Sequence, residues 1–470
     1  MKSVRYILLT LSCLAVGAGL LPTSHANSAK NAAVTFNKDI APIFFKSCAE
    51  CHRPGEAAPF SALSYKDVRP WAKSIQEHVA NRTMPPWHAD PHFGSFKNDR
   101  RLSQKEIDTI VAWVANGAPE GNAKDLPPAP SFVEGWGIGT PEVVVSMKQP
   151  YSVEATGPDE YQYFELDPGF TEDKYVRAVE ARPGNRKVVH HIVVFFQPPA
   201  PETNAPKLTQ AELTARRNQQ AKDGIRYNDG FLRRTKADAP VHNDGCALPN
   251  GGGGTKYDTS QRDNSPTLLL TEWAPGRNPD VWGAERAKKI PAGSKFIFQV
   301  HYNKAAGSVQ TDLSSIGLQF TKTPPVQPTR TELIFNGYMQ IAPGAERERI
   351  SACWTASSDV KLTALMPHMH FRGAAMQIEA VYPDGRKEMV LNVPRYDFAW
   401  QTGYVLQQPL SLPKGARLLV TGWFDNSAKN KFNPDPTKAV RWGDPTYDEM
   451  LACFIDYTVS ANASVASNNH

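Results

Sequence analysis

Two adjacent histidines interrupt an apolar stretch of this sequence. The run KVVHHIVVFF, residues 187–196, is otherwise rich in β-branched and aromatic residues, which is typical of a buried strand. Side chains alternate between the two faces of a strand, so we expect His190 and His191 to point in opposite directions. Both can bind one metal ion only if the strand twists, bulges or ends at this point.

Three further histidines lie in two other strand-like runs. In FIFQVHYN, His301 shares a face with Gln299 and Ile297. In MPHMH, His368 and His370 are two residues apart, and two imidazoles on one strand face make a ready metal site. Five histidines in three such runs favour metal binding over hydrogen-bonded core residues. Imidazole binds zinc, copper, iron and nickel, so the spacing alone does not select the metal.

The N-terminal part of the chain carries a haem-attachment pattern. Residues 48–52 read CAECH, in which Cys48 and Cys51 would bond the porphyrin vinyl groups and His52 would bind the iron. The alternative is a thioredoxin-like redox pair. That pair would sit in a βαβ setting and needs no following histidine, so the pattern favours haem.

The sixth iron ligand is expected from the loop that follows the motif. Met84, in TMPPW, lies about 30 residues beyond the motif histidine and is followed by two prolines. A thioether ligand would raise the reduction potential relative to two histidine ligands. His88 and His92 are the alternatives in the same loop.

Two predicted helices flank the haem-attachment pattern. Asn37 can cap a helix that carries apolar residues towards the motif. The run SQKE at 103–106 is a capping box, and it opens a helix with an apolar face made of Ile107, Ile110, Val111 and Val114. A helix before the motif and another after it resemble a class I cytochrome c, here expected over 34–121.

Beyond this segment the chain reads as β-rich. A proline-rich linker, 122–137, is followed by short β-rich runs separated by turns, a pattern that predicts β-sandwiches. These runs are EVVVSM, YQYFEL, VVHHIVVFF, SKFIFQVHY, KLTALMPHMHF, ARLLVTGWF and ACFIDYTV. A long insertion, 200–265, interrupts them with a capped helical stretch and four glycines, and we expect a surface excursion there. The last residues, 461–470, form a polar tail.

Composition and charge narrow the class of protein. The chain has 470 residues and a net charge of +5 without a long basic block, which argues against a nucleic-acid partner. Residues 1–26 combine a basic start, an apolar run and a small-x-Ala ending, which predicts a secretory signal peptide. No later stretch has 18 consecutive apolar residues, so we expect no stable membrane span and a periplasmic or secreted location.

Four ordered motifs resemble the copper type II, ascorbate-dependent monooxygenases, the family of peptidylglycine α-hydroxylating monooxygenase and dopamine β-hydroxylase. They are VVHHIVVFF, QVHY, PHMH and YDEMLACFIDY, and the resemblance covers 138–460. It implies a mainly β chain with two jelly-roll β-sandwich domains, 138–327 and 328–460. A small all-α class I cytochrome c domain would precede them.

The resemblance also implies two copper ions besides one covalently bound haem c. His190, His191 and His301 would bind the electron-transfer copper. The catalytic copper would be held by His368, His370 and Met450. From the residues alone Met450 could not be chosen over Met366 or Met369, and only the D-E-M run selects it. A thioether beside two imidazoles favours Cu(I).

A disulfide is implied by the same resemblance. Cys353 and Cys453 are similar in position to the bridge of the family's second domain, and such a bridge would close a loop of about 100 residues. Cys246 then has no partner.

The sequence departs from the amidating enzymes at their carboxylate-binding set. Met366 stands where they have an arginine, and Ala452 and Phe454 replace their asparagine and tyrosine. A peptidylglycine substrate is therefore disfavoured, and a small apolar or aromatic molecule is expected.

The expected function is an exported haem–copper monooxygenase that hydroxylates a C–H bond with O₂. Its electrons would come from an ascorbate-like reductant or a periplasmic redox protein and enter through the haem. The alternative is a periplasmic electron-transfer or copper-binding protein without an organic substrate. The enzyme is favoured, because a metal store needs neither two differently ligated sites nor a haem.

Overall fold

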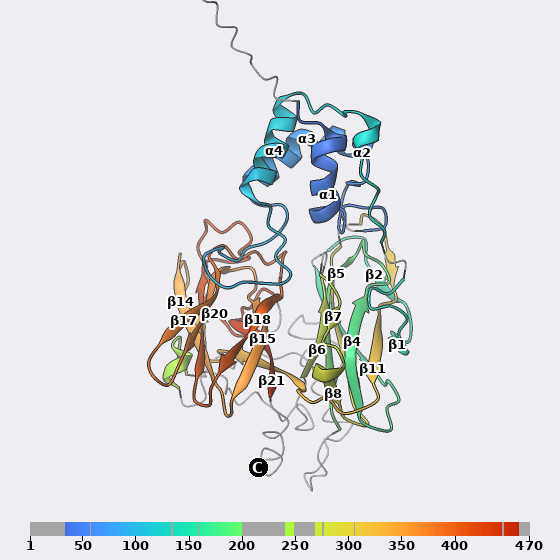
Figure 1. Ribbon diagram of the computed structural model, residues 1–470. Coiled ribbons are helices and arrows are strands. Elements are labelled where there is room, and N and C mark those ends of the chain that lie inside the picture. Colours follow the sequence, from blue (N-terminus) through green and yellow to red (C-terminus); the bar gives the residue numbers. More distant parts are fainter. Residues whose placement is uncertain are drawn as a thin grey trace, which may run out of the picture.

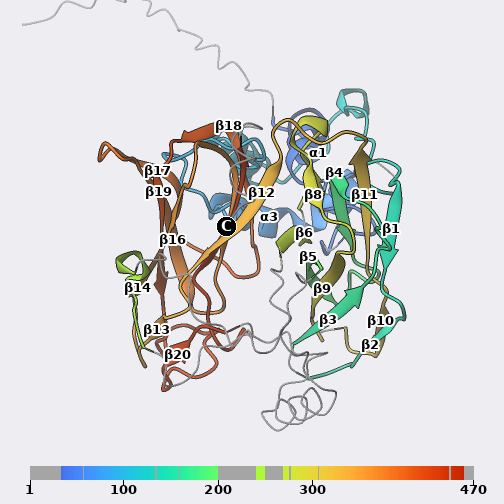
Figure 2. The same cartoon turned by 90° about the horizontal axis from the view of Figure 1, so that it is seen from below.

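The computed structural model describes residues 33–199, 240–248 and 268–459, except 57, 133–134, 158, 275–276, 305 and 444–445. The described chain is mainly β, and its paired strands are antiparallel within each sheet. Helices near the N-terminus lie above two groups of strands that stand side by side (Figures 1 and 2). The predicted signal peptide, the predicted helical stretch of the insertion and the polar tail lie outside the described residues.

The N-terminal segment is helical. Its elements are η1 (Phe36–Ile40), α1 (Ala41–Ser47), α2 (Tyr65–Val68), η2 (Arg69–Trp71), α3 (Ala72–Ala80), α4 (Gln104–Ala115) and η3 (Ala123–Asp125). The predicted capping box is confirmed, because Ser103 and Glu106 bond each other's backbone N–H at the start of α4. The prediction for Asn37 is wrong: Thr35 precedes the first turn, and Asn37 is buried within it. Four short helices do not by themselves identify a cytochrome c.

The first group of strands packs as two sheets. One sheet has the order β1-β11-β4-β7, with β8 also paired to β4, and the other has the order β3-β9-β5-β6. The strands are β1 (Val143–Ser146), β2 (Tyr151–Val153), β3 (Glu160–Leu166), β4 (Lys174–Arg182), β5 (Val189–Gln197), β6 (Leu268–Trp273), β7 (Asp280–Val281), β8 (Lys288–Ile290), β9 (Lys295–Tyr302), β10 (Gln310–Asp312) and β11 (Ser315–Thr321). One core cluster joins both sheets, so we call this group the first sandwich.

The second group of strands is built in the same way. Its sheets have the orders β12-β21-β15-β18 and β14-β19-β16-β17. The strands are β12 (Thr329–Phe335), β13 (Gln340–Ile341), β14 (Glu348–Thr355), β15 (Val360–His368), β16 (Gly373–Val381), β17 (Lys387–Val393), β18 (Tyr404–Leu412), β19 (Arg417–Phe424), β20 (Val440–Arg441) and β21 (Ala452–Val459). A separate core cluster joins these two sheets, which form the second sandwich. All seven predicted β-rich runs are strands.

Alternation along the strands decides which residues leave the core. In β5, Ile192 and Val194 belong to the core of the first sandwich, whereas His191 and Val193 line a cavity shared with the second sandwich. The same split holds in β9, where His301 shares the outer face with Gln299 and Ile297, as the sequence predicts. Each sandwich therefore keeps an apolar interior and turns one mixed face towards the other.

The loop after α3 packs onto the second sandwich. Trp87 and Phe96 belong to the core cluster of that sandwich and both contact Tyr404 edge-on or tilted. The amide of Asp90 donates to the Asn392 carbonyl at 2.8 Å. The helical segment is therefore held by tertiary contacts of its own and not only by the linker that follows it.

A stretch within the long insertion also packs onto the second sandwich. Within 240–248, the Ser351 amide donates to the Asn243 carbonyl at 2.8 Å, and Cys246 forms a disulfide with Cys353 of β14. The family resemblance therefore implied the wrong partner for Cys353, which pairs with Cys246 and not with Cys453. Cys453 is a buried free thiol in β21, in the opposite sheet of the sandwich from Cys353.

Removing this disulfide should destabilise the second sandwich. The bridge spans a sequence separation of 107 residues, for which the chain-entropy model gives about 4–5 kcal/mol. We expect the double variant Cys246→Ser/Cys353→Ser to unfold at a markedly lower urea concentration, whereas Cys453→Ser keeps the bridge. Peptide mapping without reductant checks the pairing, and a cross-linked peptide with Cys453 would contradict it.

Candidate metal centres

A β-bulge brings the two adjacent histidines to one side. Val189 pairs with Tyr302 and His191 pairs with His301, so His190 is the extra residue between two ladder positions at the start of β5. The bulge removes the alternation that would point the two rings apart. The strand does bulge at this point, which is one of the conditions set by the sequence analysis for both rings to bind one metal ion.

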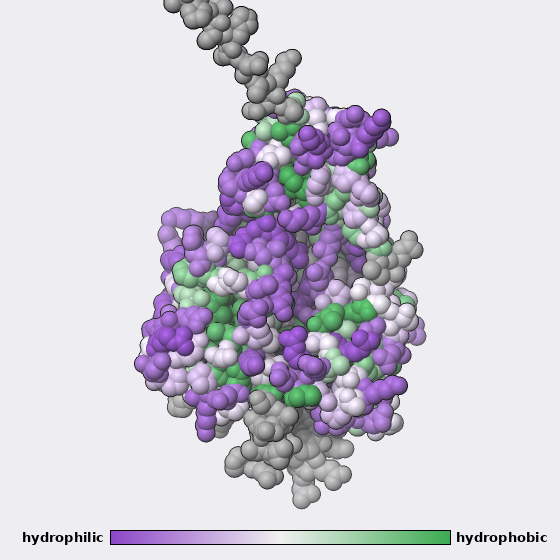
Figure 3. Space-filling view, in the orientation of Figure 1, coloured by the Kyte–Doolittle hydropathy of each residue, from purple (hydrophilic) through white to green (hydrophobic). Residues whose placement is uncertain are grey.

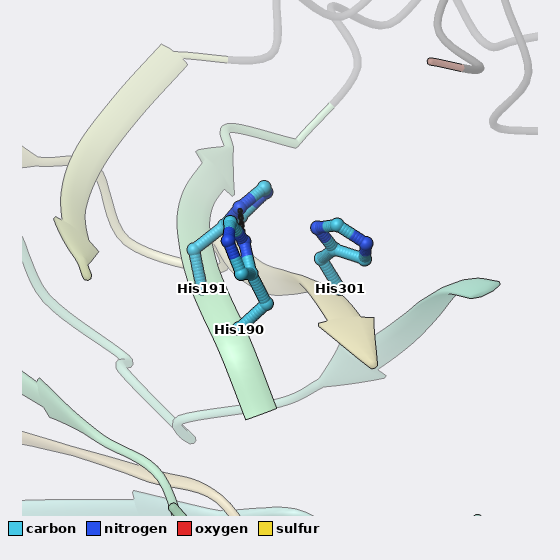
Figure 4. A group of neighbouring side chains, drawn as sticks. All are labelled: His190, His191 and His301. Carbon is cyan, nitrogen blue, oxygen red and sulfur yellow. Dashed lines mark hydrogen bonds between the residues drawn. The ribbon is translucent and has the colours of Figure 1, made fainter. Parts of the chain in front are cut away.

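His190, His191 and His301 form a compact cluster (Figure 4). One ligand atom from each lies within 4.8 Å of the others, and the Nδ1 atoms of His190 and His191 are 3.2 Å apart. Two metal–imidazole bonds of about 2.0 Å at a tetrahedral angle place their nitrogens about 3.3 Å apart. The cluster therefore has the dimensions of a three-histidine metal site.

His301 is held by two partners that the sequence reasoning did not identify. Tyr161 stacks on the imidazole, with its hydroxyl 3.2 Å from Nδ1, and the Asp159 carboxylate lies 3.0 Å from Nε2. A metal bound at one ring nitrogen would displace one partner, while the other would orient the ring. Asp159 directly precedes β3, and Tyr161 is its second residue. This strand carries no recognisable ligand motif.

Burial keeps the imidazoles of His190 and His191 neutral. The pKa of His190 falls to about 4, mainly through burial and then through His301, and burial holds the pKa of His191 well below its usual value. A neutral imidazole offers a lone pair to a metal, whereas an imidazolium cannot. His190 and His191 are thus ready to bind a cation over the whole neutral range.

The second histidine pair lies where β15 ends. The rings of His368 and His370 are 5.2 Å apart between centroids and perpendicular. His368 Nδ1 lies 2.6 Å from the Gln401 side-chain oxygen, and His370 Nδ1 lies 3.3 Å from the Asp448 carbonyl, so each ring has an orienting partner. Burial lowers the pKa of His368 to about 4 and holds that of His370 well below its usual value.

Glu449 ties this histidine pair to the D-E-M run. Its buried carboxylate accepts the backbone N–H groups of His370 and Arg372, the latter at 2.9 Å. Burial nevertheless raises the pKa of Glu449 to about 7. Because the turn after His368 is bonded to the residue before Met450, the backbone brings the thioether to the same cavity as both imidazoles.

The structure distinguishes between the three methionines that the sequence offers as a metal ligand. Met369 is fully buried in the core of the second sandwich, and its sulfur lies 3.3 Å from where a Cβ on Gly422 would stand. Met366 and Met450 both line the cavity with His368. The ligand choice is therefore reduced to these two.

One cavity of about 230 Å³ lies between the two sandwiches and contacts both histidine sets. Most of its wall is apolar, including Val193, Phe195 and Leu268 from the first sandwich and Leu333 and Phe454 from the second. The cavity is therefore shaped for a small molecule with an apolar body.

Phe398 lies between the two histidine sets. Its ring centroid is 6.1 Å from that of His190 on one side and 6.1 Å from that of His370 on the other. The phenyl ring belongs to the loop between β17 and β18, which the sequence reasoning did not assign a role. An apolar ring here keeps the two sites distinct while holding them close.

Buried charges fix the two sandwiches against each other. Trp282 Nε1 and Lys288 Nζ of the first sandwich lie 3.4 and 3.5 Å from the Asp456 carboxylate in β21. Nearby, the Arg277 guanidinium lies 2.8 Å from Glu272 Oε1. On the face shown in Figure 3, hydrophilic residues gather between the two sandwiches, below the helices.

This cluster holds one carboxyl group more than it has cations. Glu272, Asp280 and Asp456 face Arg277 and Lys288. Burial raises the pKa of Glu272 to about 7, although Arg277 opposes the rise. A proton on Glu272 therefore balances the charge of the interface.

Replacing Glu272 by glutamine should reduce the loss of stability on going from acid to neutral pH. Between the usual glutamate value of about 4.5 and about 7, the native protein holds a proton that the unfolded chain has released. Stability therefore falls as the pH rises through this window, by up to about 3 kcal/mol from this group. Glutamine cannot ionise, so Glu272→Gln should lack this contribution.

Urea unfolding at pH 5 and pH 7.5 measures the effect. The exposed Glu285 provides a matched control, because Glu285→Gln removes a carboxylate that lies outside the cluster. An unchanged pH dependence in Glu272→Gln would contradict protonation of the buried carboxyl group.

The haem-attachment motif lies at the end of α1. The amide of His52 donates to the Cys48 carbonyl at 2.9 Å, and both motif cysteines are free thiols. The His52 ring lies 4.4 Å from the Phe60 ring between centroids, and its buried Nδ1 has no hydrogen-bond partner. Two free thiols beside an unpartnered imidazole nitrogen are compatible with covalent haem.

The candidates for the sixth iron ligand lie in different surroundings. His88 is half-buried near Asp397 of the second sandwich, and His92 is exposed and lies 2.7 Å from Asp90. Met84 directly follows the turn after α3 and is half-buried. The two histidines are thus engaged elsewhere, and Met84 stays the predicted ligand.

Comparison with known proteins adds no family. No family model and no curated protein matches the chain. Among solved structures, the major capsid protein P2 of bacteriophage PM2 is 11% identical with a TM-score of 0.24, covering 70% of this chain and 98% of its own. PNGF-II in a P21 crystal is 10% identical with a TM-score of 0.29, covering 68% and 65%. Likenesses this low carry no argument about fold or function.

No helix in the described part of the chain is long and apolar enough to cross a membrane.

Proposed function

We propose that this protein is an exported copper monooxygenase of the ascorbate-dependent type, with two jelly-roll domains and a haem c in its N-terminal segment. One observation carries the proposal. A three-histidine cluster in one sandwich, through His191, and a His-His-Met set in the other line the same inter-sandwich cavity. The four family motifs supply the ligands of both.

The two ligand sets suit two different tasks. His190, His191 and His301 would hold a copper with nitrogen ligands alone, whereas Met450 adds a soft sulfur to His368 and His370. Copper, when bound, would supply one-electron steps at the first set and oxygen activation at the second. Because hydroxylation takes two electrons per O₂, a chain with one copper at each set could deliver both.

The cavity wall favours a small apolar or aromatic substrate. The position occupied by an arginine in the amidating enzymes is Met366, and Met366 and Phe454 both line the cavity beside His368. Neither offers a charge to a carboxylate. Gln299 and Tyr163, which bond each other at 2.6 Å, provide a polar group on the opposite wall that could orient a substrate hydroxyl.

The haem c would supply electrons. Cys48 and Cys51 would hold it, and His52 with Met84 would complete the coordination of its iron, which suits electron relay rather than oxygen binding. An ascorbate-like reductant or a periplasmic redox protein would reduce it from outside.

Oxygen uptake that depends on an added small apolar or aromatic compound tests the proposal. The protein should contain one iron that stays attached on denaturation and two coppers, and a panel of such compounds should include one that is hydroxylated with consumption of O₂. A protein that holds both coppers yet consumes no oxygen with any compound of the panel would be an electron-transfer or copper-binding protein instead.

A further inference from the structure

A direct contact joins the CAECH segment to the first sandwich. The Arg186 guanidinium forms an ion pair with Glu56, which follows the motif histidine by four residues. Arg186 lies three residues before the start of β5, the strand that carries His190 and His191. With Arg53 and Glu56 it lines an open cavity of about 370 Å³ between the segment and the sandwich.

Arg186 also contacts a tryptophan on the side of the histidine cluster. Its guanidinium lies over the ring of Trp273, 5.7 Å from the centroid. Trp273 is the last residue of β6, pairs with Ile192 of β5 and is 8% exposed. It lines a small cavity together with His190 and His191. The indole thus has the cation of the haem-side contact on one side and the metal-binding histidines on the other.

We propose that Trp273 is the electron-transfer contact between the haem of the CAECH segment and the copper of the three-histidine cluster. Arg186, fixed by Glu56, is the positioning residue that holds the two parts together. The inference rests on the proposed function. One electron leaves ferrous haem iron, which becomes ferric, and reduces Cu(II) to Cu(I). The indole conducts it without being oxidised, and no proton is transferred.

The π system of Trp273 shortens the route that the backbone alone would offer. From Arg186 to His190 an electron would otherwise follow the single bonds of several residues along the chain. The indole offers one buried aromatic group that contacts Arg186 and lines the cavity of His190 and His191. In the described part of the chain, Trp273 is the one aromatic residue shared by the Arg186 contact and the small cavity beside the histidines.

Flash-initiated reduction of the fully metallated protein tests the proposal. Less than one electron per molecule is delivered without oxygen, and relaxation of the haem absorbance reports exchange with the copper. We expect Trp273→Leu to slow this relaxation by about tenfold, which corresponds to a barrier higher by about 1.4 kcal/mol. Trp273→Phe, which keeps an aromatic ring, should be intermediate. Trp423→Leu, which removes a tryptophan that Arg347 contacts in β19 of the second sandwich, should relax like the wild type.

The salt dependence of the relaxation provides a second measurement, which a merely structural role of these residues would not change. The Arg186–Glu56 pair is partly exposed, so high ionic strength should weaken it and slow the relaxation of the wild type. Glu56→Gln should be slower at low salt and nearly insensitive to added salt.

The outcomes separate this inference from the proposed function. Absence of haem or copper from the wild type would contradict the proposed function. With both metals bound and the haem and copper spectra unchanged, equal relaxation in Trp273→Leu and wild type would overturn the role of Trp273 alone. A control Trp423→Leu that slowed as much as Trp273→Leu would overturn it as well.

Discussion

Replacing His301 by alanine should remove one of the two coppers and leave the haem iron in place. His301 is the only member of its cluster on β9, and its ring lies 4.6 and 4.9 Å from those of His190 and His191 between centroids. At 1% exposure it leaves no route for solvent to replace it in the native packing. Two adjacent histidines alone would then hold the ion weakly.

Metal analysis and oxygen uptake measure this effect. The copper content should fall from two to one per chain, and substrate-dependent oxygen uptake should fall by more than ~100-fold, because even loss of an outer partner of a ligand costs up to that factor. His242→Ala is the matched control, since His242 is exposed beside Tyr338, away from both sets. Two coppers retained in His301→Ala, or zinc bound in their place, would refute the assignment.

Replacing Met450 by alanine should weaken only the second copper. The thioether is the soft ligand that favours Cu(I), so we expect the affinity for Cu(I) at His368 and His370 to fall at least about tenfold. The three-histidine cluster is built on β5 and β9 of the other sandwich and should keep its metal. Turnover should be lost, because oxygen binds the reduced site.

X-ray absorption of the reduced protein distinguishes the two remaining methionines. Met450→Ala should lose the copper–sulfur signal, and Met366→Ala, which truncates a methionine of the same cavity, should keep it. The reverse result would make Met366 the ligand. Met369 needs no variant, since its side chain is in the core.

The sequence predicted the strands and the histidine sets because both depend on local pattern. Alternation in FIFQVHYN places Phe298 and Val300 in the core and His301 outside it, as observed. The sequence named a bulge only as one of the ways in which His190 and His191 could bind one ion, because neighbouring residues of a regular strand point to opposite faces. The structure has the bulge at His190.

What the sequence did not predict depends on contacts between distant segments. Gln401 and Asp159 orient ligand rings, yet neither lies in a motif, and only the folded chain brings them to the histidines. The disulfide was misassigned for the same reason. Cys246 lies in an insertion whose return to the second sandwich has no local signal, so the resemblance supplied the wrong partner for Cys353.

The segment that Cys246 anchors to the second sandwich links the two sandwiches, so they cannot simply be separated. After β5 the chain leaves the first sandwich, reaches the second at residues 240–248, and only then returns to supply β6 through β11. The covalent ring closed by Cys246 and Cys353 therefore contains strands of both sandwiches. During synthesis the anchoring segment emerges before β14, its docking site, exists. A fragment cut at the boundary near 327 would carry an unpaired thiol and a loose segment, so the two sandwiches are not interchangeable modules despite their separate cores.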